Sequence, residues 1–280
     1  MSPSIDKTSR PIGVFDSGVG GLTVVRAIRS RLPDEEILYF GDTARVPYGT
    51  KSPETIRRYT REISSFLNNQ GVKCVVVACN SCSATALDCV TDCFEGPVIG
   101  VIEPGSRKAL SVTRNGRVGV IGTQATVDSG AYERTLRGFS PEVQVFSTAC
   151  PLFVPLAEER MDGRQAARLI AEEYLHPLLE QSIDTLILGC THYPLLKETI
   201  QSVVGEDIAI VDSAETTAER VFETLRELEE LESSKKEARI QTYVSDNPQG
   251  VEKFCRFLMP DERIWVGTAQ PSMISSEVKG

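Results

Sequence analysis

Short apolar runs alternate along the chain with longer amphipathic segments, which is the pattern of an α/β fold. The apolar runs at 11–15, 36–40, 75–78, 98–102, 117–122, 143–146, 185–188, 208–211 and 240–244 have the length of buried strands. Segments of helical periodicity follow most of them, at about 22–32, 53–70, 129–136, 163–179, 213–231 and 250–258. Because buried parallel strands are apolar on both faces, the pattern predicts parallel sheets whose strands are joined by helices.

The same order of motifs occurs twice in the chain. Residues 117–123 resemble residues 11–17, and in each half a later strand ends on a cysteine. Cys79 follows Asp16 at nearly the interval at which Cys190 follows Gly122. We therefore predict two similar, pseudo-symmetric α/β domains, although two unrelated α/β segments would share part of this pattern. The expected domains are 11–100 together with 212–270, and 101–211, with loose termini at 1–10 and 271–280.

Local signals mark the ends of two predicted helices. Ser52 stands directly before Pro53, a combination that is typical of a helix N-terminus. Ser213 is expected to cap the long helix that follows it. The later part of that helix, at 227–237, is dense in charge and indicates a solvated helix end or a flexible connector.

Composition narrows the class of protein. The chain has 280 residues, of which 41% are hydrophobic and 25% charged, as in an ordinary globular protein. The net charge of -9 argues against a nucleic-acid or anionic-membrane partner, because both require a basic face. No apolar run approaches the roughly 20 residues that span a bilayer, and the polar N-terminus lacks the apolar core of a secretory signal peptide. We therefore expect a cytoplasmic enzyme whose eight cysteines are mostly thiols.

Two cysteines stand at the ends of predicted strands, where open α/β sheets bind their ligands. Cys79 and Cys190 are therefore expected in one cleft, where two thiols can act as a pair of acid/base groups. His192 follows Cys190 closely and can tune its thiol or transfer a proton, although a lone histidine is often structural. The glycine-rich stretch 16–21 does not match the dinucleotide or phosphate-loop patterns. Its glycines are instead expected to form a tight turn that brings Asp16 to the cleft.

Cys79 and Cys82 form a Cys-x-x-Cys pair, which leaves a redox or metal site as an alternative. A zinc site is disfavoured because the chain has no second such pair and only two histidines, so we predict no metal. A dithiol at a strand-to-helix turn resembles a thioredoxin-like site and remains open as a dithiol oxidoreductase. A small-molecule binding protein with two α/β domains is a further alternative from a different class.

Five motifs occur together in one order: Asp-Ser-Gly-Val-Gly-Gly-Leu-Thr at 16–23, Pro-Tyr-Gly at 47–49, Cys-Asn-Ser at 79–81, Pro-Leu-Phe-Val-Pro-Leu at 151–156, and Gly-Cys-Thr-His-Tyr-Pro at 189–194. Together they resemble the glutamate racemases of the aspartate/glutamate racemase family, over about residues 11–225. The resemblance implies cofactor-independent interconversion of L- and D-glutamate, which supplies D-glutamate for peptidoglycan. It also implies two similar domains with the site between them, and a homodimer. A racemase for another acidic amino acid such as aspartate is the nearest alternative.

The resemblance assigns roles to particular residues. The implied catalytic residues are Cys79, Cys190, Asp16, His192 and Glu158. Cys79 would act on D-glutamate and Cys190 on L-glutamate, each followed by a helix N-terminus that favours the thiolate. The implied substrate contacts are Ser17, Pro47, Tyr48, Gly49, Asn80, Ser81, Thr191, Thr123 and Thr126.

Three positions qualify this assignment. Ser81 stands where the family commonly has threonine, and it keeps the hydroxyl. Cys82 stands where the family commonly has a small residue such as alanine, which raises the question of oxidation with Cys79. Glu159 adjoins Glu158, so the resemblance leaves open which of the two is the assisting acid.

Overall fold

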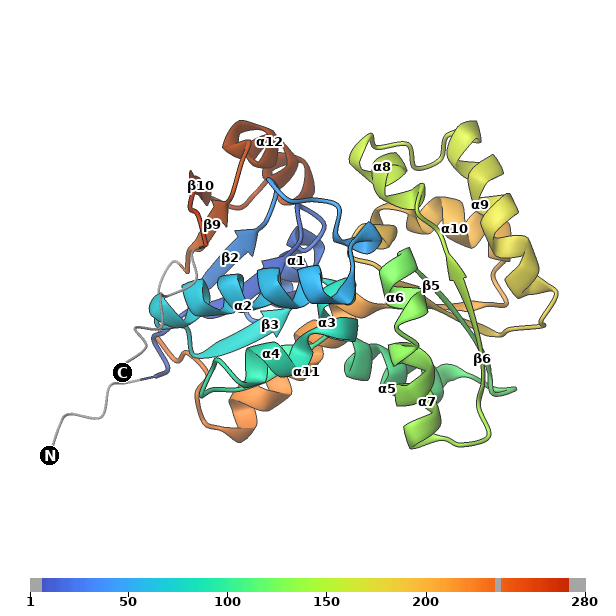
Figure 1. The fold of residues 1–280 in the computed structure, drawn as a ribbon, viewed down its shortest axis with the longest axis horizontal. Coiled ribbons are helices and arrows are strands. Elements are labelled where there is room, and N and C mark those ends of the chain that lie inside the picture. The colour runs from blue at the N-terminus through green and yellow to red at the C-terminus, as the bar shows by residue number, and fades with distance from the viewer. Residues whose placement is uncertain (1–6, 235–237, 272–280) are drawn as a thin grey trace, which may run out of the picture.

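The computed structural model describes residues 7–234 and 238–271, in which the strands form two parallel sheets (Figure 1). The larger sheet has the order β10-β9-β2-β1-β3-β4, and the smaller one β6-β5-β7-β8. Four consecutive strands of the larger sheet, β2-β1-β3-β4, thus repeat the chain order of β6-β5-β7-β8. The prediction of an α/β fold with parallel sheets is confirmed, and the shared strand order supports the inferred duplication.

The strands of the larger sheet are β1 (Ile12–Asp16), β2 (Ile37–Gly41), β3 (Cys74–Val77), β4 (Val98–Gly100), β9 (Ile240–Val244) and β10 (Ile264–Thr268). Those of the smaller sheet are β5 (Arg117–Gly122), β6 (Gln144–Ala149), β7 (Thr185–Gly189) and β8 (Ala209–Asp212). The α-helices are α1 (Leu22–Arg31), α2 (Pro53–Asn69), α3 (Asn80–Thr85), α4 (Leu87–Thr91), α5 (Ile102–Val112), α6 (Gln124–Asp128), α7 (Ala131–Phe139), α8 (Phe153–Glu158), α9 (Gln165–Leu179), α10 (Lys197–Val204), α11 (Ser213–Glu227) and α12 (Pro248–Leu258). Two short 3-10 helices are η1 (Tyr48–Thr50) and η2 (Tyr193–Leu196).

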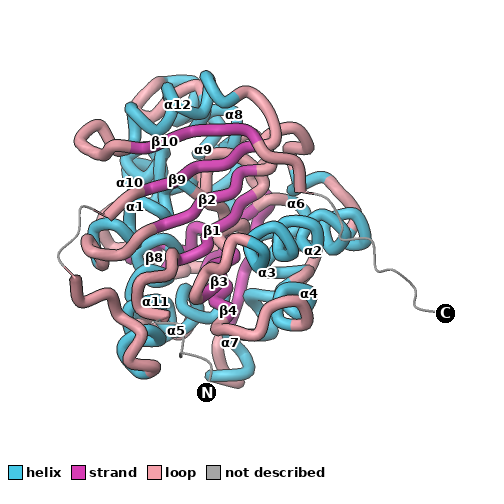
Figure 2. The backbone as a smooth tube through the Cα atoms, turned by 90° about the vertical axis from the view of Figure 1, so that its left-hand side faces the viewer, coloured by secondary structure: helices cyan, strands magenta, loops and turns pink. Residues whose placement is uncertain are grey.

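Helices cover both faces of the larger sheet (Figure 2). Successive side chains of a strand point to opposite faces, so neighbouring residues of β1 enter different cores. Val14 packs in the core that contains α1 and α11, whereas Phe15 packs in the core that contains α2. Because both cores are apolar, the strands read as continuous hydrophobic runs in the sequence.

The helix caps differ in one place from the prediction. Ser52 caps α2 as predicted, since its Oγ accepts a hydrogen bond from the Thr55 backbone N–H at 3.3 Å. The predicted cap Ser213 is wrong: Asp212 is the N-cap of α11, and its Oδ1 accepts from the Ala214 N–H at 2.8 Å. Ser213 instead donates from its Oγ to the Leu188 carbonyl, which ties α11 to β7. Both aspartate and serine are good N-caps, and here the carboxylate is the one within reach of the first free backbone N–H.

One predicted strand proved to contain the start of a helix. The apolar run 98–102 was expected to be one strand, but β4 ends at Gly100 and Ile102 begins α5. Both Val101 and Ile102 are buried in the core of the smaller sheet, so the same apolar residues serve two elements. An apolar run of this length does not by itself distinguish a strand from a buried helical turn.

After β8 the chain returns to the larger sheet, where α11 packs on α1 and strands β9 and β10 extend the edge. This sheet membership is compatible with the domain boundaries at 100/101 and 211/212, which stay a prediction. Within the described N-terminal residues 7–10, the Thr8 carbonyl accepts a hydrogen bond from Lys73 Nζ at 2.8 Å. In the segment 227–237, Leu231 packs against the core that contains α1 and α11. Residues 235–237 lie outside the described residues, as do the terminal stretches 1–6 and 272–280.

None of the helices in 7–234 and 238–271 is both long and apolar enough to cross a membrane.

Candidate active site

Both cysteines singled out from the sequence lie at the carboxyl ends of central strands and face one cavity. Cys79 follows the end of β3 by two residues, and Cys190 follows β7 directly. Both side chains are buried, at 4% and 5% exposure, and both are free thiols. The cavity has a volume of about 290 Å³, the lower end of the range for small-molecule sites. The repeat thus delivers one thiol from each sheet to a space of the size of a small metabolite.

Most of the predicted site residues line this cavity. They are Ser17, Pro47, Tyr48, Gly49, Cys79, Asn80, Ser81, Thr123, Glu158, Cys190, Thr191 and His192. Sequence reasoning did not name the other lining residues, which are Val46, Thr50, Gln124, Pro151, Val154 and Pro155. Three of these belong to the motif at 151–156, so the motif itself was the available signal.

Two predicted residues, Asp16 and Thr126, lie behind the cavity wall. The Asp16 carboxylate accepts from the Gly18 N–H at 3.0 Å and from the Thr191 hydroxyl at 3.3 Å. Thr126 Oγ1 lies 3.1 Å from Thr123 Oγ1 and 3.4 Å from Ser81 Oγ. Asp16 and Thr126 therefore contact residues that line the cavity but do not line it themselves.

The environment of Cys79 favours its thiolate. A hydrogen bond from the Cys82 thiol lowers the pKa of Cys79, against the opposing effects of burial and of the Asp16 charge. Burial raises the pKa of Cys82 well above its ordinary value, which keeps Cys82 protonated as the donor. Cys79 is also the N-cap residue of α3, where the helix dipole favours a negative charge.

Cys190 has a different neighbour from the one expected. The predicted α-helix N-terminus after Cys190 is absent, because the 3-10 helix η2 begins at Tyr193 and α10 only at Lys197. The His192 ring takes this place, with Nδ1 3.9 Å from Cys190 Sγ. The two thiols thus have different neighbours. Cys79 has a helix N-terminus and a second thiol beside it, whereas Cys190 has an imidazole.

Cys190, His192 and Glu158 form a chain of contacts. His192 Nε2 lies 3.0 Å from Glu158 Oε1, while Nδ1 faces the sulfur. Burial lowers the pKa of His192, but hydrogen bonds to Cys190 and Glu158 outweigh it and raise the pKa to about 10. The hydrogen bond to His192 in turn lowers the pKa of Glu158. The geometry therefore favours Glu158 over Glu159 as the acid that acts with His192.

The glycine-rich stretch 16–21 is needed for close approach rather than for unusual backbone angles. Gly18, Gly20 and Gly21 are not among the described glycines with positive φ. A Cβ on Gly20 would lie 2.4 Å from Thr191 Oγ1 and 2.5 Å from His192 Nδ1. The chain does turn at 17–21 as predicted, and the glycines are needed there because a side chain at Gly20 would displace the residues beside Cys190.

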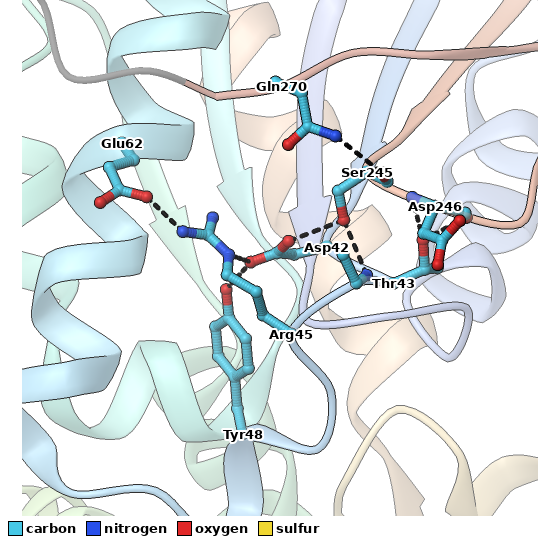
Figure 3. Close-up of polar contacts among 9 residues, drawn as sticks. Asp42, Thr43, Arg45, Tyr48, Glu62, Ser245, Asp246 and Gln270 are labelled. Atoms are coloured by element: carbon cyan, nitrogen blue, oxygen red, sulfur yellow. Dashed lines mark hydrogen bonds and ion pairs between the residues drawn. The ribbon is translucent and has the colours of Figure 1, made fainter.

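A buried carboxylate holds the loop that carries Tyr48 (Figure 3). The Tyr48 hydroxyl donates to Asp42 Oδ2, which also accepts from Arg45 Nε at 2.6 Å. Ser245 Oγ donates to the other oxygen at 2.8 Å, and the Ser245 carbonyl accepts from Gln270 at 2.9 Å. Burial raises the pKa of Tyr48, so its hydroxyl stays a donor to Asp42. Tyr48 lines the cavity while its hydroxyl is bound to Asp42, and segments after β9 and β10 support the loop.

No group of three or more histidine, cysteine or carboxylate side chains in 7–234 and 238–271 is placed to hold a metal ion. A larger hollow of about 980 Å³ lies beside β9, β10 and α12, but neither Cys79 nor Cys190 lines it. The chemistry-bearing residues therefore gather in the smaller cavity.

Two repeated α/β units each present one buried thiol to a common cavity, and comparison with known proteins places this arrangement in a family of racemases. The chain belongs to the Asp/Glu/hydantoin racemase family, whose sequence model matches residues 22–221. A glutamate racemase of Geobacter metallireducens is 54% identical over 241 residues, which cover 86% of this chain and 89% of the relative. The resemblance stated from the motifs is thereby confirmed.

Solved structures agree with this membership. A glutamate racemase of Bacillus anthracis superposes with a TM-score of 0.90 at 38% identity, covering 94% of this chain and 98% of the other. The Francisella tularensis glutamate racemase, solved in complex with D-glutamate, has a TM-score of 0.89 at 38% identity and covers 95% and 99% of the two chains. The similarity thus extends over both sheets and the cavity between them.

Proposed function

We propose that this chain interconverts L- and D-glutamate by moving the α-proton between Cys79 and Cys190, without a cofactor. The observation that carries the proposal is the placement of two buried thiols, from equivalent strands of two repeats, on one cavity of about 290 Å³. Racemisation requires removal of a proton from one face of Cα and delivery to the other. Two acid/base groups on different walls meet this requirement.

In the direction from D- to L-glutamate, the Cys79 thiolate takes the α-proton and the Cys190 thiol donates its proton to the opposite face. Cys79 then holds the proton and Cys190 is the thiolate, so the reverse reaction starts from the state that the forward reaction leaves. The Cys82 hydrogen bond supports Cys79 as the base, since it lowers the pKa of Cys79. His192, with Glu158 behind it, exchanges a proton with Cys190.

The α-proton is far less acidic than a thiol, so the negative charge that develops on the substrate must be stabilised. Donors from both repeats line the cavity, among them Asn80, Ser81 and Thr191. Preorganised donors in a buried site stabilise such a charge more strongly than water does. The imidazolium of His192 adds a positive charge, since its pKa is raised to about 10.

The biological assignment follows from the same reaction. The product D-glutamate would serve peptidoglycan synthesis in the cytoplasm, with no nucleic-acid or membrane partner. The resemblance to the family further supports a homodimer as the active form.

The proposal is tested with L-glutamate in heavy water, without added pyridoxal phosphate. Solvent deuterium is expected to enter Cα while the optical rotation decays toward zero. Absence of exchange would contradict racemisation and favour a binding protein. The same assay with L-aspartate decides between the two acidic substrates, because the two-thiol chemistry is indifferent to side-chain length.

Cys82→Ala distinguishes the racemase from a dithiol oxidoreductase. We expect the variant to keep glutamate turnover within about tenfold of the wild type, because Cys82 only modulates the base. Loss of its hydrogen bond raises the pKa of Cys79, so the acidic limb of the kcat/KM profile for D-glutamate should move to higher pH. A dithiol oxidoreductase would instead lose its activity in this variant, because it needs both thiols. An unchanged pH profile of racemisation would refute the role given to Cys82.

A further inference from the structure

The Asn80 carboxamide is satisfied at only one end. Asn80 is the first residue of α3 and is 3% exposed at the cavity wall. Its Oδ1 accepts a hydrogen bond from the Tyr132 hydroxyl at 2.7 Å, whereas its Nδ2 has no partner among the described residues. Buried polar groups are almost always paired, so an unpaired amide on a cavity wall indicates where a ligand oxygen binds.

Tyr132 is held rigidly in the position from which it reaches Asn80. It lies on α7, is 3% exposed, and packs in the core of the smaller sheet. Its ring also packs closely against the backbone at Gly189, where an added Cβ would lie 3.1 Å from Tyr132 Cε2. Burial raises the pKa of Tyr132, so the phenol keeps its proton and acts as a donor.

The direction of this hydrogen bond selects one orientation of the amide. A donor at the Tyr132 hydroxyl requires the carbonyl oxygen of Asn80 opposite it, which turns the NH₂ group away. Tyr132 belongs to the second repeat and Asn80 to the first, so the bond also links the two repeats.

We propose that Tyr132 is a positioning residue for racemisation: its hydroxyl fixes the Asn80 carboxamide so that Nδ2 donates to the α-carboxylate of the substrate. The inference rests on the proposed function, because it takes glutamate as the ligand. Asn80 directly follows Cys79, the proposed base, so we assign its amide to the end of the substrate that carries the reacting carbon. Negative charge on the α-carboxylate grows as the α-proton leaves, so a fixed N–H donor stabilises that state.

The test is a double-mutant cycle with Tyr132→Phe, Asn80→Ala and the double variant. Tyr132→Phe keeps the buried ring and removes only the hydroxyl, and we expect kcat/KM for D-glutamate to fall about tenfold. Asn80→Ala, which removes the donor itself, should lower it about a hundredfold. If Tyr132 acts through Asn80, the double variant should match Asn80→Ala within about twofold.

A purely structural role would give a different result. It would lower the unfolding temperature and add its loss to that of Asn80→Ala, so additive losses overturn the inference. Tyr243→Phe, a tyrosine on β9 that does not line the cavity, is the matched control and should stay within about twofold of the wild type.

The same cycle is measured for D-glutamate binding by calorimetry, which does not depend on turnover. Coupled losses of affinity in Tyr132→Phe and Asn80→Ala support the positioning role, and additive losses overturn it. A wild type that binds glutamate without racemising it would contradict the proposed function, while the binding cycle would still decide the role of Tyr132.

Discussion

Cys79→Ser and Cys190→Ser are each expected to lower glutamate racemisation by about three orders of magnitude or more, within the range for loss of a general acid or base. A serine hydroxyl at either position is too weak an acid to take over the proton transfer. Both thiols line the same cavity and are buried, so the exchange of sulfur for oxygen is a small change in volume. Turnover is followed by polarimetry with each enantiomer as substrate.

The two serine variants should also differ from each other in heavy water. Cys79→Ser retains the base for L-glutamate and should exchange its α-proton slowly with retention of configuration. Cys190→Ser should do the same with D-glutamate only. Cys93→Ser, at a partly exposed cysteine away from the cavity, is the control and should racemise normally. A serine variant at Cys79 or Cys190 with normal turnover would rule out the two-thiol mechanism.

His192→Asn is expected to lower turnover about a hundredfold, the lower end of the effect of a positioned proton-transfer group. Asparagine keeps a polar side chain of similar size but holds no exchangeable charge between Cys190 and Glu158. Because the two enantiomers are equal in energy, kcat/KM must fall equally in both directions, so the asymmetry is sought in solvent exchange. In heavy water, exchange of the α-proton without inversion should slow more for L-glutamate, because Cys190 is the base for that enantiomer, and equal slowing for both enantiomers would argue that His192 acts only by shaping the cavity.

The same variant changes how stability depends on pH. The folded protein raises the pKa of His192 from 6.5 to about 10, so the charged imidazole stabilises the fold fully below about pH 6.5. This contribution is lost as the pH rises toward 10. Thermal unfolding temperatures should therefore fall between pH 6.5 and 10 in the wild type, and fall less in His192→Asn. Glu158→Gln removes the charge opposite the imidazole, so its unfolding temperature should also fall less over this pH range than that of the wild type.

Local patterns sufficed where the decisive contacts are local. The strands around Cys79 and Cys190 are apolar runs, and hydrophobic period and length predict such elements well. The helix cap at Ser52 depends only on residues up to Thr55. The short helices α6, α8 and α10 escaped prediction because few turns leave little periodicity, whereas the start of α5 was assigned to the apolar run 98–102. The cap at Asp212 is as local as that at Ser52, but aspartate and serine cap helices about equally well, so residue type did not choose between Asp212 and Ser213.

The candidate site shows the same division between near and distant residues. The motifs named most of the cavity lining in advance, since each motif follows a strand whose end faces the cavity. The amino-acid order did not reveal that Asp42 holds Tyr48, or that Tyr132 holds Asn80. Neither partner belongs to a motif, and Tyr132 joins Asn80 from the other repeat.

By itself, the sequence determined the α/β class, the repeat of strand and cysteine, and the family that the motifs define. These properties follow from hydrophobic period and from short stretches of contiguous residues. Only the tertiary structure decided that both thiols share one cavity, that Glu158 rather than Glu159 meets His192, and that Cys190 has an imidazole in place of a helix N-terminus. Such contacts join residues far apart in the chain, so they depend on how the two sheets pack and not on local preference.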